Sequence, residues 1–198
     1  MSRPALTLGA ATAIVLGAVF ALNTAARSAA EAQTRNPLTG EKPAERPAPA
    51  WHNSSWLNTP DGKPLSLSGL KGRVVLLNFW TFTCWNCTGL VPSLVAYDRA
   101  YRDQGLTIIG IHDPEFPPYG GEHDKSNVAD ALRKYHIEYA NAQDNDHATW
   151  NLYDIQAWPS YVLIDKRGNI RFEGAGEFHV DDGNYREWDA RIRGLLAE

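Results

Sequence analysis

Apolar residues follow two different periods along the chain after residue 50. Arg73 to Trp80 (RVVLLNFW) and Leu106 to Ile111 (LTIIGI) are near-continuous apolar runs, which is typical of strands buried on both faces at the centre of a sheet. From Cys84 to Gly105 the spacing changes to steps of three and four residues, which predicts a helix. The apolar positions of this helix are Leu90, Leu94, Tyr97 and Tyr101.

The second half of the chain ends in a hairpin followed by a helix. Ser160 to Asp165 (SYVLID) and Ile170 to Glu173 (IRFE) flank a turn that contains Gly168, and this pattern predicts a β-hairpin. Weaker patterns precede it: a helix with Val128, Leu132 and Tyr135 on one face, a strand at Tyr139 to Gln143, and a short helix at His147 to Tyr153. The last helix carries Trp188, Ile192, Leu195 and Leu196 on one stripe. Strands that alternate with helices and finish in a hairpin predict an α/β sandwich with a central mixed sheet, parallel in its first part and flanked by helices on both faces.

The N-terminal segment is of another kind. Arg3 precedes the apolar run Ala5 to Leu22, and small residues follow, with Ala30 and Ala32 at suitable cleavage positions. This is typical of an export signal, and a run of about 18 apolar residues is also near the minimum for a membrane span. Residues 1–30 are therefore predicted to be a signal peptide or an N-terminal membrane anchor; a buried core helix is disfavoured because the run has no amphipathic stripe. The charge of Arg3 places the rest of the chain outside the cytoplasm, in the periplasm or another extracytoplasmic space.

Residues 31–50 are polar and rich in proline, so we expect an extended linker there and one folded domain over 51–198. The 198-residue chain is 43% apolar and has a formal net charge of −4, which is typical of a globular protein. Because no basic block is present, nothing predicts a nucleic-acid surface. Protein or small-molecule partners are the expectation.

The two cysteines, Cys84 and Cys87, lie at the predicted junction of a strand and a helix, where such a pair can be a structural disulfide, part of a metal site or a redox centre. A structural disulfide across so short a loop constrains little of the unfolded chain. A metal site needs two or more further ligands; the six histidines show no ligand spacing, although His112 and His123 lie near the end of a strand. A redox pair has a direct physical basis. At the start of the helix Cys84 is stabilised as a thiolate, and Cys87, one turn deeper, can resolve a mixed disulfide on it.

Several segments resemble a known family. "VVLLNFWTFTCWNC" is similar to the active-site segment of thioredoxin-like proteins of the exported TlpA and ResA type. "GIHDPEF", "SNVADAL" and "DNDHATWNLYDIQAWPSYVLIDKRGNIRFEGAGE" are more specifically similar to the thioredoxin-like domain of DipZ-type membrane proteins, and the likeness covers nearly all of residues 51–198. The resemblance implies that Cys84 is the exposed nucleophile and Cys87 the buried resolving cysteine. It also implies that Pro159 is a cis-proline facing their disulfide, and that Trp158 pairs through its backbone with an extended substrate.

Two positions depart from that family pattern. Asn78 stands where cytoplasmic thioredoxins have a buried aspartate, and Leu90 stands where ResA-type proteins have a glutamate. Glu115, in the loop after the second core strand, is the nearest candidate for a carboxylate that moves the proton of Cys87; an ordinary exposed loop acid is the other interpretation, and water can serve instead.

The residues around the cysteines are expected to bind substrate. Trp85 and Asn86 differ from the Gly-Pro pair of thioredoxin, so the redox potential is not inherited from it. Trp80, Trp85 and Trp158 can form an apolar rim around Cys84, although Trp80 suits the core equally well. The other tryptophans are assigned to packing: Trp51, Trp56, Trp150 and Trp188.

The expected function is that of an extracytoplasmic thiol:disulfide oxidoreductase that reduces protein disulfides. By resemblance it has no cofactor beyond the redox-active Cys84–Cys87 disulfide, receives electrons from a membrane donor, and has cytochrome c biogenesis as its setting. One alternative is a metal- or copper-handling thioredoxin-like protein. Another is a thiol-dependent peroxidase of related fold: Thr81 has the Thr-x-x-Cys spacing of such enzymes, but the proline usual between these residues is missing.

Overall fold

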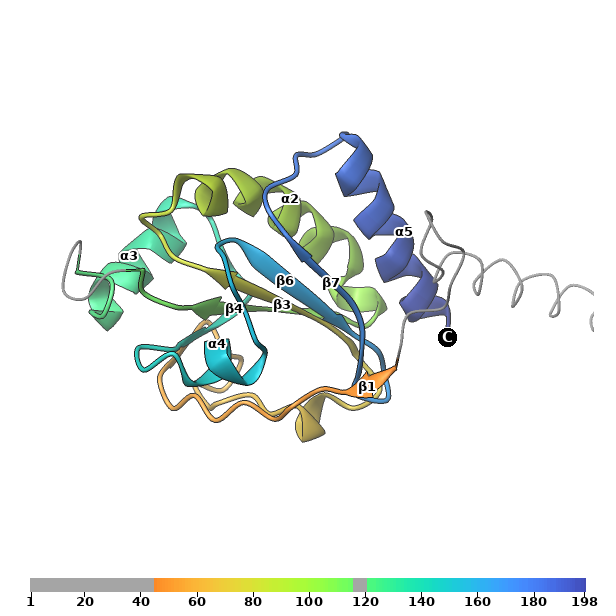
Figure 1. The fold of residues 1–198 in the computed structure, drawn as a ribbon, viewed down its shortest axis with the longest axis horizontal. Helices are drawn as coiled ribbons and strands as arrows, with labels where there is room; N and C mark the ends of the chain where they lie inside the picture. The colour runs from red at the N-terminus through yellow and green to blue at the C-terminus, as the bar shows by residue number, and fades with distance from the viewer. Residues whose placement is uncertain (1–44, 116–120) are drawn as a thin grey trace, which may run out of the picture.

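Seven strands form one mixed sheet in the computed structural model, which describes residues 45–115 and 121–198 (Figure 1). β3, β4 and β5 run parallel to one another. β6 runs antiparallel to β3, and β7 runs antiparallel to β6 and so in the same direction as β3. In sheet order the strands are β1 (Arg46–Pro47), β7 (Asn169–Ala175), β6 (Ser160–Ile164), β3 (Val74–Trp80), β4 (Leu106–His112), β5 (Ala140–Gln143) and β2 (Trp56–Leu57).

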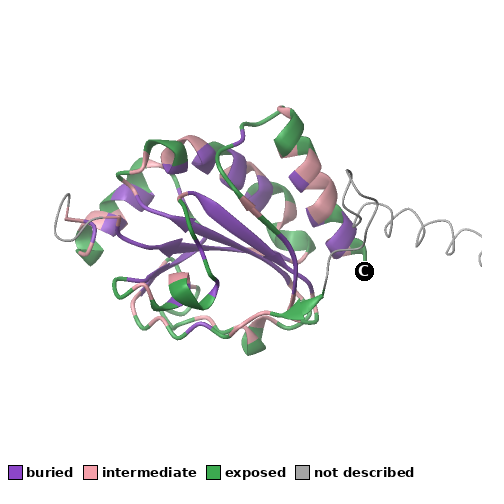
Figure 2. Cartoon of the chain, viewed as in Figure 1, coloured by how far each residue is buried: buried purple, intermediate pink, exposed green. Residues whose placement is uncertain are grey.

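Helices cover both faces of this sheet, as the sequence predicts. One face packs against α2 (Trp85–Tyr101), α3 (Lys125–Lys134) and α5 (Gly183–Ala197). The other packs against α4 (Ala148–Leu152) and the segment 48–70, which includes a 3-10 turn at Ser68–Leu70; a second such turn, Arg102–Gln104, follows α2. The central strands are buried along nearly their whole length (Figure 2). The prediction of an α/β sandwich with a central mixed sheet is therefore confirmed.

Strand β3 shows why the apolar run around residue 77 is continuous rather than alternating. All seven of its residues are buried, because β4 and β6 pair with it on either side and both faces of the sheet are covered. Trp80, at its end, is fully buried and its Nε1 donates to Asn141 Oδ1 at 3.0 Å. A Cβ atom on Gly110 of the next strand would lie 1.9 Å from that oxygen, so only glycine leaves room for the bond. Trp80 therefore belongs to the core and not to a surface rim.

Two short strands were not predicted. Arg46 and Pro47 lie within the segment 31–50 that was expected to be a linker, but they form β1 and pair with β7. Trp56 and Leu57 form β2 beside β5. Two residues are too few to show a period in the sequence, and a proline is tolerated at the outer strand of a sheet. The folded part consequently begins before Trp51.

The segment predicted as a signal peptide or anchor lies outside the described residues. Across 45–115 and 121–198, no helix is both long and apolar enough to cross a bilayer.

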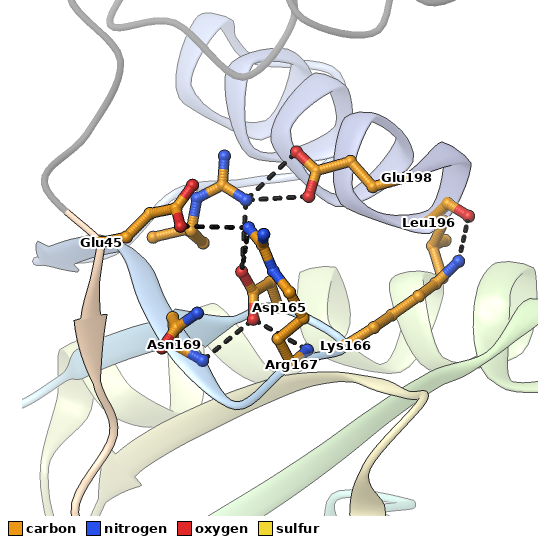
Figure 3. Close-up of polar contacts among 8 residues, drawn as sticks. Glu45, Asp165, Lys166, Arg167, Asn169, Leu196 and Glu198 are labelled. Atoms are coloured by element: carbon orange, nitrogen blue, oxygen red, sulfur yellow. Dashed lines mark hydrogen bonds and ion pairs between the residues drawn. The ribbon is translucent and has the colours of Figure 1, made fainter.

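Ion pairs join the segments at the end of the sheet where β3, β4 and β5 begin, called here the amino end (Figure 3). Arg171 is fully buried, and its Nη1 lies 3.3 Å from Asp165 Oδ2 and 2.8 Å from Glu198 Oε2. Arg167 Nη2 lies 3.1 Å from Glu45 Oε2 and 3.4 Å from Asp165 Oδ2. The first described residue, the hairpin turn and the last residue of the chain are thus held together.

Candidate active site

Both cysteines lie where β3 leads into α2, at the opposite end of the sheet, called here the carboxyl end. Cys84 is the N-cap residue of α2, with φ −75° and ψ 115°. Its Sγ is bonded to that of Cys87, the two Cα atoms are 5.2 Å apart, and the same Sγ accepts a hydrogen bond from the backbone N–H of Cys87 at 3.3 Å. One of the unpaired amide groups of the helix N-terminus is therefore directed at Cys84.

The two sulfurs have different surroundings. Cys84 is half-buried, whereas Cys87 is fully buried and packs in the core that includes Trp80, Leu90 and Leu94. The helix N-terminus and the N–H donor favour the thiolate of Cys84, and an apolar environment favours the neutral thiol of Cys87. The arrangement gives an accessible nucleophile and a sheltered second thiol on one helical turn.

Pro159 follows a cis peptide bond, as the resemblance implied. In the antiparallel register of β3 and β6, Phe79 faces Ser160, so Pro159 lies opposite Trp80, four residues before Cys84. The half-buried Trp158 packs its ring against that of Trp150, with centroids 4.2 Å apart. The residue before the cis-proline is thus held at the carboxyl end of the sheet.

Trp85 and Asn86, the two residues between the cysteines, are both exposed. Trp85 is 85% exposed, the largest value among the large apolar side chains of the described residues. An aromatic side chain in this position adds apolar area next to Cys84. Trp85 and Trp158 therefore remain available for a substrate-binding rim, without Trp80.

Asn78 is fully buried in β3. Its strand neighbours at even positions, Leu76 and Trp80, pack in the same cluster as Cys87, so its side chain is on the helix-covered face. In the described part of the chain, neither its amide oxygen nor its nitrogen has a hydrogen-bond partner. Asn78 supplies no acid to Cys87, and neither does Leu90, which is buried in α2.

A carboxylate does lie at the loop before Cys84, but it is that of Glu122. Glu122 is 1% exposed, and its Oε1 accepts hydrogen bonds from the hydroxyl groups of Thr81 and Thr83. Its Oε2 accepts from the backbone N–H of Glu115 at 3.1 Å. The predicted proton carrier, Glu115, is half-buried and contributes a backbone group to this network.

Two further titratable groups are buried at this end of the sheet. Burial lowers the pKa of His112 to about 4; its ring stacks on Phe82 with centroids 5.3 Å apart, so it is neutral near pH 7. Burial, followed by the charge of Asp144, raises the pKa of Asp113 to about 8. His147 Nδ1 lies 2.8 Å from Asp113 Oδ1.

His112, one of the two histidines considered as metal ligands, has surroundings unlike those of a metal site. His112 lies between aromatic rings, edge-on to Trp80 with centroids 5.4 Å apart. Among residues 45–115 and 121–198, no three His, Cys, Asp or Glu side chains are grouped so as to hold an ion.

Sequence reasoning missed Glu122. Its hydroxyl donors, Thr81 and Thr83, are 41 and 39 residues earlier in the chain, so only the path of the loop after β4 brings them together. The available signal was weak: two threonines that bracket Phe82 directly before Cys84, and an acid where the chain returns toward α3.

Comparison with known proteins agrees with this geometry. The profile of the AhpC/TSA family matches residues 45–173. Protein DipZ of Mycobacterium bovis is 41% identical over 145 residues, which cover 73% of this chain and 20% of DipZ. The thiol-disulfide oxidoreductase ResA of Bacillus subtilis is 27% identical over 58% of this chain and 59% of its own length.

Solved structures extend the likeness to the fold. A thioredoxin-like protein determined in its oxidised form superposes with a TM-score of 0.65, covering 77% of this chain and 96% of its own, at 22% identity. The chain spans about a fifth of the length of DipZ and of the human NHL repeat-containing protein 2. Because the family profile covers most of the described residues, the chain belongs to the AhpC/TSA family and is homologous to thioredoxin-like thiol:disulfide oxidoreductases.

Proposed function

We propose that this protein is an extracytoplasmic reductase of protein disulfides that uses Cys84 and Cys87 as its dithiol. The observation that carries the proposal is the position of Cys84: it caps α2, accepts the N–H of Cys87, and lies half-exposed above a fully buried second cysteine. That asymmetry suits an attacking thiolate and a resolving thiol.

The reaction has two exchange steps. The Cys84 thiolate attacks one sulfur of a substrate disulfide; the substrate S–S bond breaks, a mixed disulfide forms on Cys84, and the other substrate sulfur leaves as a thiolate that takes up a proton. Cys87 then loses its proton and attacks Cys84 Sγ, which releases the second substrate thiolate and leaves the Cys84–Cys87 disulfide. Two electrons pass from the enzyme to the substrate, so a donor dithiol must restore the reduced enzyme.

Substrate contacts are supported by the residues around Cys84. An extended chain beside Trp158 can pair with its backbone next to the cis-proline. The exposed ring of Trp85 can bury apolar surface of a protein substrate. Trp85→Ala should therefore raise KM for a protein disulfide more than for a small disulfide such as oxidised glutathione.

Location and electron supply rest on the sequence. The run Ala5 to Leu22 after Arg3 supports export or anchoring. The donor in the membrane is proposed from the resemblance to DipZ-type membrane proteins described in the sequence analysis. A fusion of residues 1–50 to alkaline phosphatase tests export, because that reporter is active only outside the cytoplasm.

The central experiment measures insulin reduction by the purified protein with dithiothreitol as donor. Cys84→Ser should abolish turnover, and unchanged turnover would exclude the mechanism. Cys87→Ala should stop at the mixed disulfide and hold the partner on Cys84, while a variant lacking both cysteines is the control that traps nothing. Peroxide consumption in place of insulin reduction, or stoichiometric metal on the reduced protein, would favour the peroxidase or metal-handling alternative instead.

The proton of Cys87 needs an acceptor, and Glu115 is the one proposed from the sequence. Glu115→Gln should then shift the pH dependence of insulin reduction. An identical pH profile would remove Glu115 from the reaction and leave water or another carboxylate of the same loop.

A further inference from the structure

The segment 176–182, between β7 and α5, is fixed both to the cis-proline and to α2. The backbone N–H of Gly176 donates to the carbonyl oxygen of Pro159 at 2.9 Å. Two residues later Phe178 is buried, and its carbonyl oxygen accepts a hydrogen bond from the hydroxyl of Ser93 at 2.9 Å. Glu177 lies between these two attachments, so its backbone is held on both sides.

The side chain of Glu177 lies against α2 at Gly89. A Cβ atom on Gly89 would be 2.6 Å from Glu177 Oε2 and 3.8 Å from His179 Cε1. Because this position is glycine, the carboxylate can rest directly on the helix. Gly89 and Trp85 are four residues apart, so they share one face of α2. Glu177 therefore contacts α2 one turn beyond the exposed Trp85.

The carboxylate of Glu177 is accessible to a bound partner. Its side chain is 35% exposed. In the part of the chain that the structure describes, it forms an ion-pair contact only with His179, whose Nε2 lies 3.9 Å from Glu177 Oε1. That separation is too long for a hydrogen bond. The acceptor sites of this carboxylate can thus receive a cationic side chain from a substrate.

The distance from Glu177 to the reacting sulfur suits a neighbouring residue of the substrate. Gly89 comes five residues after Cys84, which is about 7.5 Å along the helix axis. An extended chain advances about 3.3 Å per residue, so two substrate residues span this distance. A lysine or arginine two residues from the attacked substrate cysteine can therefore reach Glu177.

We propose that Glu177 is a specificity-determining residue that binds a lysine or arginine close to the disulfide of a protein substrate. The ion pair forms while the substrate is held at Cys84, so it favours both the encounter complex and the mixed disulfide. The two exchange steps stay as described, and Glu177 transfers neither a proton nor electrons. The inference rests on the proposed reductase function and adds its substrate class, which is a disulfide with a cationic neighbour.

The test compares two disulfide peptides that differ at one position, with lysine or glutamine two residues from a cysteine. Each peptide is mixed with the reduced protein in the absence of other thiols, and the second-order rate of Cys84–Cys87 oxidation is measured. At low salt the wild type should react about fivefold faster with the lysine peptide. Glu177→Gln, which keeps the size and removes the charge, should lose most of this ratio. An unchanged ratio in Glu177→Gln would overturn the inference.

A matched control removes one negative charge from the same segment. Asp181 is exposed and has φ 72°, a conformation that asparagine tolerates. Asp181→Asn should keep most of the preference for the lysine peptide, because an exposed charge is screened by solvent and salt. An equal loss in both variants would show that the net charge of this segment, and not Glu177, selects the substrate.

A direct measurement uses the mixed disulfide that Cys87→Ala holds on Cys84. The carboxyl ¹³C signal of Glu177 should shift when the lysine peptide is trapped and should shift less with the glutamine peptide, because only lysine brings a charge to the carboxylate. Equal shifts with both peptides would contradict the inference. Failure of the reductase function is a separate result: the reduced wild type would then react with neither peptide.

Discussion

The two ends of the sheet use charge in opposite ways. At the carboxyl end, the loops 81–84, 113–115, 121–124, 144–147, 153–159 and 176–182 contain no lysine or arginine. Their acids are Asp113, Glu115, Glu122, Asp124, Asp144, Asp146, Asp154, Glu177, Asp181 and Asp182. At the amino end, the connections 58–73, 102–105, 135–139 and 165–168 mix both signs. Their charged residues are Asp61, Lys63, Lys71, Arg73, Arg102, Asp103, Glu138, Asp165, Lys166 and Arg167.

This difference in charge matches a difference in role: the charges at the amino end stabilise the fold, and those at the carboxyl end lie at the end of the sheet that carries the redox site. At the amino end, Arg171 and Arg167 are paired with acids that fasten the hairpin turn and the last residue. At the carboxyl end, Asp113 and Glu122 are both buried, and the loops named above contain no arginine or lysine. Buried acids shift the pKa values of neighbouring groups. Such shifts are not needed for stability, but a redox site can use them.

The largest effect is expected from breaking the amino end. Arg171→Ala leaves the buried Asp165 without its buried cation, and loss of one partner of a buried pair costs about 3–5 kcal/mol of unfolding free energy. The potential of the Cys84–Cys87 couple should stay the same. Urea unfolding and glutathione equilibration measure the two quantities. Arg167→Ala is the matched control, because exposed pairs contribute about 1 kcal/mol or less. A shifted potential in Arg171→Ala would mean that the two ends are coupled.

The next effect concerns Asp113 at the carboxyl end. Its pKa is raised to about 8, with burial as the first cause, so between about pH 4 and pH 8 the folded protein binds a proton that the unfolded chain has lost. The unfolding free energy must therefore fall as pH rises through that window. Asp113→Asn removes this dependence and should be more stable than the wild type by a few kcal/mol at pH 9, with the difference vanishing near pH 4. Parallel stability curves for the two proteins would contradict the assignment.

His112 should produce a smaller effect in the opposite direction. Burial lowers its pKa to about 4, so on acidification the unfolded chain binds the proton first and stability falls from about pH 6.5 down to pH 4. Near pH 5 the loss should be roughly 1.5 kcal/mol. Histidine ¹³C and ¹⁵N shifts should show one ring still neutral at pH 5. A titration of His112 near pH 6.5 would refute this account of its surroundings.

The smallest effect is expected from exposed charges. Neutralising Asp146, Asp154 and Asp181 to asparagine should slow the reduction of a cationic disulfide peptide about two- to threefold at low salt, and not at high salt. Lys63→Gln with Lys71→Gln, at the amino end, should leave that rate unchanged. Equal slowing by both sets would show that the overall charge of the protein matters and its distribution does not.

The sequence predicts the parts of this molecule that depend on local pattern. The continuous burial of β3, the helix after Cys84 and the hairpin of β6 and β7 follow from period and turn chemistry, and the structure confirms them. Strands β1 and β2 could not be predicted, because two residues show no period and their pairing is decided by the rest of the sheet. Trp80 could be assigned to core or rim only after its bond to Asn141 was seen.

The candidate site divides in the same way. The positions of Cys84 and Cys87 on one helical turn follow from their spacing. The position of Glu122 cannot be predicted from the sequence, because its contacts with Thr81 and Thr83 depend on how a long loop rich in proline and glycine returns to the sheet. Proximity along the sequence instead indicated Glu115 as the proton carrier, and in the structure the backbone N–H of Glu115 donates to Glu122.

Strand β1 also determines where a restraint on the chain would act. It joins the sheet beside the hairpin turn at the amino end, and the seven residues of β3 put the disulfide about 23 Å away along the strand direction. A restraint applied through the residues before Glu45 would thus act at the end of the domain that lies farthest from Cys84. Rotation of the domain about that attachment point would move the disulfide through a large distance. Partners in different positions and orientations could then reach Cys84 without any conformational change inside the domain.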